Sequence, residues 1–135
     1  MTTQARIVNT LLNDAMENIY DNYRWLQVST SDTALSNTLT TLPDSVQIGL
    51  TSGEFNKVKE TGALGSFIIN NRAVWIFKLL SGEPDTLPVN LHAFGLMKQQ
   101  TNGAGLGIHG RLPVAATKDN QSVWQIRNES QVRRA

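Results

Sequence analysis

The glycines at positions 105, 107 and 110 match the Gly-x-Gly-x-x-Gly fingerprint of dinucleotide-binding proteins. In that fingerprint the glycines bring the backbone close to a pyrophosphate at the start of a helix. Here Pro113 follows closely, and proline breaks a helix interior. The phosphate loop of nucleotide hydrolases needs Lys and then Ser or Thr after its last glycine, but Arg111 and Leu112 stand there. We therefore expect no nucleotide binding and interpret residues 103–110 as a flexible or closely packed loop.

The other candidates for catalysis or metal binding are scattered along the chain. His92 and His109 have no ligand motif between them, and a metal site needs three or four convergent ligands. The absence of cysteine removes disulfides, thiolate nucleophiles and sulfur ligands together. Ser66 lacks the second glycine of a nucleophile elbow, and the close carboxylates Glu83 and Asp85 flank a proline in a predicted turn. We expect no enzyme, no cofactor and no metal, and the roles of the two histidines stay open.

Aromatic side chains form a third candidate site. Exposed, they would make a stacking platform for a sugar or for single-stranded nucleic acid; buried, they belong to the core. The residues concerned are Tyr20, Tyr23, Trp25, Trp75, Phe77, Phe94 and Trp124. Arg111, Lys118 and Arg127 lie near Trp124 in the chain, but strand alternation places Arg127 on the face opposite to Trp124. Two binding functions stay open: a ligand- or carbohydrate-binding β module, and a single-stranded nucleic-acid-binding β-barrel.

The elements that must position these residues are organised around residues 66–80, which hold nine large apolar side chains in fifteen residues. This pattern predicts a β-hairpin, with Asn70 and Asn71 at the centre of a type I′ turn because asparagine tolerates positive φ. A two-residue turn fixes the register and places Phe67 opposite Val74. Both strands are therefore expected to pair closely around this turn.

The predicted hairpin is apolar on both faces. One face carries Ile68, Ala73, Trp75, Phe77 and Leu79, and the other carries Phe67, Ile69, Val74 and Ile76. Strands of this kind are covered on both sides, by other parts of the chain or by another chain. We expect Trp75 and Phe77 to be core residues. The second face is a predicted interface.

Residues 1–26 carry the strongest helix signal, with a cap at Thr2 or Thr3 and an end near Arg24. The apolar stripe includes Val8, Leu12, Ile19 and Tyr23, which we also take as candidate interface residues. Two interpretations stay open. The stripe resembles a short heptad seam in which Asn22 would set the register of a bundle of identical helices, but a broad apolar stripe more often packs on its own sheet.

The rest of the chain fits a single domain over residues 1–135. Residues 27–45 are rich in Ser and Thr and predict a polar bridging arm or an ordinary loop. Residues 46–128 predict an antiparallel β core, which includes strands at 46–50, 89–98, 112–116 and 123–127. Residues 129–135 predict a polar, basic tail. The expected fold is α+β and mainly β: an N-terminal helix on an antiparallel β-sandwich or flattened barrel of about six strands.

The charge and the hydropathy of the chain limit the kinds of partner that it can be expected to bind. The charged fraction is 17% and the net charge is +1, so the polar surface must consist largely of Thr, Ser, Asn and Gln. From Lys98 onward, six basic residues face only Asp119 and Glu129, a basic bias too weak to predict nucleic-acid binding. No apolar run reaches the length of a membrane span, and the N-terminal residues lack a signal-peptide core. We expect a soluble protein that binds neither membrane nor nucleotide.

The absence of chemistry, the two-sided apolar strands and the weakly charged polar surface favour a non-enzymatic assembly subunit. Across the whole chain this composition resembles that of structural proteins of tailed-bacteriophage virions. The resemblance implies a virion component of the tail, the connector or the capsid surroundings, with copies of itself or other assembly proteins as partners. Without it, the expected location is cytoplasmic.

Overall fold

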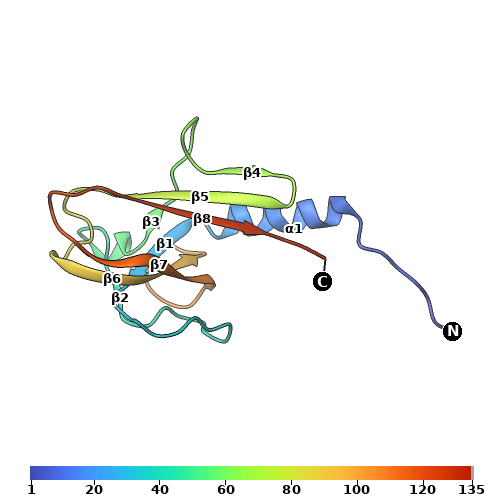
Figure 1. Cartoon of the computed structure of the whole chain (residues 1–135), viewed down its shortest axis with the longest axis horizontal. Coiled ribbons are helices and arrows are strands. Elements are labelled where there is room, and N and C mark those ends of the chain that lie inside the picture. The colour runs from blue at the N-terminus through green and yellow to red at the C-terminus, as the bar shows by residue number, and fades with distance from the viewer. Residues whose placement is uncertain (135) are drawn as a thin grey trace.

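The computed structural model describes residues 1–134, apart from the side chains of Val114 and Ala115. In this part of the chain, one α-helix and one short 3-10 helix accompany eight strands (Figure 1). The elements are α1 (Asn9–Asn22), β1 (Trp25–Ser29), β2 (Ser45–Val46), η1 (Ser52–Glu54), β3 (Lys57–Val58), β4 (Phe67–Ile69), β5 (Arg72–Leu79), β6 (Val89–Met97), β7 (Leu106–Lys118) and β8 (Trp124–Gln131). The predicted fold class, α+β and mainly β, is confirmed.

The strands form two antiparallel sheets. Sheet A has the order β2-β1-β6-β7, with β3 also paired to β1, and sheet B has the order β4-β5-β8. The main hydrophobic core lies between the sheets and takes side chains from both, among them Leu26, Leu96, Phe77 and Ile126. The arrangement is a sandwich, and the chain crosses between the two sheets after β3, after β5 and after β7.

Helix α1 lies under the part of sheet B that extends beyond sheet A (Figure 1). Met16 enters the core, and the Tyr20 ring lies 5.6 Å from the Trp75 ring, centroid to centroid. The Trp75 indole N–H donates a hydrogen bond of 2.9 Å to the Tyr23 carbonyl. The apolar stripe thus packs on the chain's own sheet, the second of the two interpretations.

The predicted start of the helix is wrong. Helix α1 begins at Asn9, its N-cap is Val8 without a side-chain capping bond, and residues 1–8 are extended away from the fold with every side chain exposed (Figure 1). The reason is physical: residues 1–8 lie beyond the sheet, and a helical turn without an apolar surface to cover is marginal in water. Thr2 and Thr3 therefore cap nothing. The eight residues are called the N-terminal arm below.

The hairpin register is confirmed, with Phe67 opposite Val74 and Ile69 opposite Arg72. The turn type is wrong, since Asn70 has a positive φ of 56° but Asn71 does not. Asn71 is instead held in line with sheet B by two bonds to Val132: its side-chain amide donates to the Val132 carbonyl at 2.7 Å, and its carbonyl accepts from the Val132 N–H at 2.9 Å. The turn therefore carries one left-handed residue.

The β6 strand departs from strict alternation. A β-bulge between Leu91 and Ala93 turns Leu91 to the core face, together with Phe94 and Leu96, whereas strict alternation would place it with Ala93 and Met97. The strand predicted at 46–50 is also shorter, because the chain leaves β2 after Val46, and Leu50 is 80% exposed. The core face of β6 and the length of the strand predicted at 46–50 thus differ from what the sequence pattern indicates.

The glycine-rich segment is a strand from Leu106 onward rather than a loop through Gly110. Its glycines serve close packing, since a Cβ at Gly107 would collide with the Tyr23 ring and one at Gly110 with the Phe94 ring. No helix follows, and Pro113 lies inside β7, an edge strand where proline is tolerated. Of the two predicted alternatives, a flexible segment or a closely packed one, the structure shows close packing.

The Ser/Thr-rich segment divides in two. Residues 27–29 belong to β1, and residues 30–44 cross the outer face of sheet A as a loop (Figure 1). The loop is held to β7 along its length: Arg111 pairs with Asp32, the Ser36 N–H donates to Nδ1 of His109, and the Thr40 carbonyl accepts two backbone bonds. It therefore covers the buried outer-face residues Gln27, Ser29, Ala93 and Met97.

Strand β8 reaches Gln131 and so takes in half of the predicted tail at 129–135. The three residues that follow it, 132–134, lie against the hairpin turn and the start of α1. Arg134 donates to the Ile7 carbonyl at 2.8 Å and 2.6 Å and to the Asn9 side-chain oxygen at 2.9 Å. These bonds hold the base of the N-terminal arm.

Candidate functional site

The hairpin residues predicted as an interface share the outer face of sheet B. Val74 and Ile76 lie in the central strand β5 and are 1% and 8% exposed, while Phe67 and Ile69 lie in the edge strand β4 and are 41% and 54% exposed. The β8 side of the same face is charged, since Glu129 lies 3.3 Å from Arg72 and 3.8 Å from Arg127. The exposed apolar part is therefore limited to β4.

The helix residues predicted as an interface are less accessible. Leu12 is buried, and Ile19 and Tyr23 pack against the core, so these three serve the chain's own fold. Val8 is 62% exposed and stands at the end of the N-terminal arm. Asn22 bonds back to Asn18 on the exposed helix surface and sets no seam.

The aromatic residues do not form an exposed platform. Three of the seven are buried, and the other four, Tyr20, Tyr23, Trp25 and Trp124, are partly buried. Trp75, Phe77 and Phe94 are core residues, and Tyr20 packs against the core. Trp124 is only partly buried and lines a groove between β7 and β8. Sequence reasoning noted Trp124 as aromatic but did not find the groove.

This groove is mainly apolar and has a volume of about 580 Å³. The lining residues come from β6, β7, β8 and the turn before β8: Phe94, Arg111, Leu112, Pro113, Ala116, Val123, Trp124, Gln125, Ile126 and Arg127. We call it the edge groove. Its floor is formed by the core residues Phe94 and Ile126. Arg111 and Arg127 stand at its rim, and both side chains are exposed.

Both walls of the edge groove are sheet edges. Strand β7 pairs only with β6, and β8 pairs only with β5, in the part of the chain that the structure describes. Unpaired edges present backbone N–H and C=O groups that can bind another strand. Pro113 removes one donor from β7, whereas β8 contains no proline. The edge of β8 is therefore the better template.

A buried lysine, Lys118, holds the β7–β8 turn next to the groove. The Lys118 ammonium donates to the carbonyls of Leu80, Asp119 and Ser122 at 3.1, 2.8 and 2.6 Å, and burial lowers the pKa of Lys118. The first carbonyl belongs to the connection after β5, and the others belong to the β7–β8 turn. Three carbonyls satisfy the three donors of the ammonium, so Lys118 is a structural residue.

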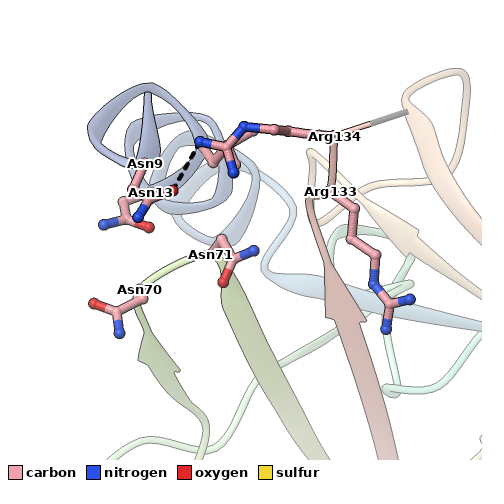
Figure 2. Close-up of a pocket in the computed structure, with 7 residues that line it drawn as sticks. Asn9, Asn13, Asn70, Asn71, Arg133 and Arg134 are labelled. Atoms are coloured by element: carbon pink, nitrogen blue, oxygen red, sulfur yellow. Dashed lines mark hydrogen bonds between the residues drawn. The ribbon is translucent and has the colours of Figure 1, made fainter. Parts of the chain in front are cut away.

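A second recess, of about 430 Å³, is polar and lies where α1, the hairpin turn and the C-terminal residues meet. Figure 2 shows Asn9, Asn13, Asn70, Asn71, Arg133 and Arg134 around it, with Arg134 reaching to Asn9. Amides and guanidinium groups can bind an anion or a carbonyl by hydrogen bonds, but they supply no nucleophile and no general base at neutral pH. Arg134 already bonds to the arm and α1, which gives this recess a structural role.

The titratable groups do not converge on a reaction site. His109 accepts a hydrogen bond from the loop, and His92 lies 3.9 Å from Asp32. Among the described residues, no group of three or more potential ligands could hold a metal ion. Lys59 donates to the Tyr20 carbonyl at 3.0 Å and lies over its ring, and partial burial lowers the pKa of Lys59 to about 8.

None of the helices in residues 1–134 is long and apolar enough to cross a membrane. The chain was compared with protein-family models, with curated proteins and with solved structures, and none of them matches it.

Proposed function

We propose that the chain is a structural subunit that self-associates or docks into a larger protein assembly, without catalysing a reaction. The observation that carries the proposal is the edge groove, an apolar recess bounded by two sheet edges that are unpaired in the monomer. Such edges are commonly blunted in proteins that stay monomeric, by charges, prolines or covering loops. Here Pro113 and Arg111 blunt the β7 edge, and the loop 30–44 covers the outer face of sheet A, but the β8 side of the groove stays open.

The outer face of sheet B supports the same function independently. Phe67 and Ile69 are large, apolar and exposed on neighbouring positions of one sheet face, next to the buried Val74. Single exposed apolar residues are ordinary, but a second apolar surface beside free edges adds to the association propensity. The low charged fraction of 17% removes the repulsion that keeps monomers apart.

The proposed setting is the virion of a tailed bacteriophage, and it rests on the compositional resemblance described above. Nothing in the geometry chooses between tail, connector and capsid positions. The ligand-binding and single-strand-binding functions gain less support, because all seven aromatic side chains that would carry them are buried or partly buried.

Sedimentation equilibrium of the purified chain tests the proposal. We expect a mass above that of the 14.9 kDa monomer at tens of micromolar, or a stable complex with a neighbouring assembly protein. Association that persists in moderately high salt would indicate apolar contacts rather than charge pairs. A monomer that associates neither with itself nor with assembly proteins would contradict the proposal.

A further inference from the structure

We propose that the edge groove of one copy receives the N-terminal arm, residues 1–8, of a second copy, which adds as a strand to the free edge of β8. This inference rests on the proposed assembly function and names the contact that carries it. The result is a head-to-tail assembly in which each copy gives an arm at one end and receives one at the other.

The arm has the properties of a strand that lacks a sheet. Every residue from Met1 to Val8 is exposed, and its backbone makes no sheet pairing within the described chain. A strand alternates its side chains between two faces. One face of the arm then carries Met1, Thr3, Ala5 and Ile7, and the other carries Thr2, Gln4, Arg6 and Val8. The first face is mainly apolar and fits the groove, while the second would join the outer face of sheet B, where Glu129 offers Arg6 a carboxylate beside Arg127.

The length of the arm agrees with the length of β8. Eight residues in extended conformation span about 26 Å, at about 3.3 Å per residue. Strand β8 is also 8 residues long. The arm contains no proline, so each residue whose N–H faces β8 can donate to the pairing.

The position of the arm favours binding to the groove of a second copy over binding to the groove of the same copy. Arg134 binds the Ile7 carbonyl and Asn9, and from this anchor the arm runs outward, away from the sheets (Figure 1). The edge groove lies at the other end of β8, beside the β7–β8 turn. A donor at one end and an acceptor at the other make a heterologous contact, which closes into rings or extends into filaments.

Charge placed on either face of the arm tests the orientation. We expect Ala5→Asp to weaken self-association at least about tenfold in sedimentation equilibrium, because it would put a carboxylate against apolar side chains. Gln4→Asp adds the same charge to the neighbouring, solvent-side position and is the matched control, with an expected change below about twofold. Val123→Asp, in the groove and 57% exposed in the monomer, should act like Ala5→Asp without unfolding the chain.

Cross-linking tests the partner. The chain has no cysteine, so single-cysteine variants react only where they are placed. We expect a mixture of Ala5→Cys and Gln125→Cys proteins, treated with a short bismaleimide, to give a heterodimer. A mixture of Ala5→Cys with Leu50→Cys, an exposed position outside the groove, should give only background.

Each other outcome overturns the inference in a different way. Association that is unchanged by Ala5→Asp and by Val123→Asp would leave the assembly function standing and remove the arm contact. Cross-linking within an Ala5→Cys, Gln125→Cys double variant, without heterodimers in the mixture, would show that the arm binds its own groove. A chain that stays monomeric and binds no assembly protein would remove both proposals.

Discussion

Replacement of Trp75 by alanine should destabilise the fold more than most other single changes. The side chain is 0% exposed, its N–H donates to the Tyr23 carbonyl at 2.9 Å, and its ring contacts Tyr20. Truncation of a buried Trp costs about 3–5 kcal/mol. The entropy of unfolding is about 2.1 cal/mol/K per residue, or about 0.28 kcal/mol/K for 135 residues, so a loss of 4 kcal/mol lowers Tm by about 14 °C.

Trp75→Phe separates the hydrogen bond from the packing. It keeps most of the ring volume but leaves the Tyr23 carbonyl without its donor, which costs about 1–3 kcal/mol and lowers Tm by about 4–11 °C. Leu50→Ala, at a position 80% exposed, is the control and should change Tm by less than about 2 °C. Thermal and urea unfolding followed by circular dichroism measure all three. A Trp75→Ala protein with an unchanged Tm would refute the assignment of this ring to the core.

Two further predictions concern packing and pH. Gly110→Ala should lower the free energy of unfolding in urea by about 1–3 kcal/mol, because the new Cβ meets the Phe94 ring. Phe94→Leu in the same chain should recover part of this loss. Equal stability of Gly110→Ala and the unmodified chain would contradict the close contact. For Lys59, the pKa is about 8 in the folded chain and 10.5 in the unfolded chain, so between these values the unfolded state binds more protons and stability rises with pH. Unfolding of the unmodified chain and of Lys59→Met, compared from pH 7 to pH 9.5, should show this rise only in the former; the range stops below the raised pKa of Tyr20, and parallel curves would contradict the shift.

The sequence predicted local pairing well. The register of the β4–β5 hairpin followed from two asparagines between apolar runs, and the core face of β5 followed from period-two alternation. Both depend on residues that are neighbours in the chain. The β-bulge in β6 was not predicted, because nothing in residues 91–93 marks which residue the partner strand skips.

Contacts between distant segments were beyond sequence reasoning. The loop 30–44 lies over sheet A through backbone carbonyls and short polar side chains, which carry no periodic signal. The late start of α1, at Asn9, depends on where sheet B stops. The edge groove depends on β7 and β8 both being edges, for which Pro113 was the one available sign, since proline inside a strand indicates an edge.

The order in which the chain visits the two sheets has a consequence for synthesis on the ribosome. The chain enters sheet A with β1 to β3, sheet B with β4 and β5, sheet A again with β6 and β7, and sheet B last with β8. Strand β5 pairs with β4 on one side, but its other neighbour, β8, lies more than forty residues further along the chain, as the Arg72–Gln131 pair shows. A nascent chain that stops before β8 has every strand of sheet A but only β4 and β5 of sheet B. The core around Phe77 therefore lacks Ile126 of β8 until translation is nearly finished. Release of truncated chains should consequently give aggregates rather than smaller folded units.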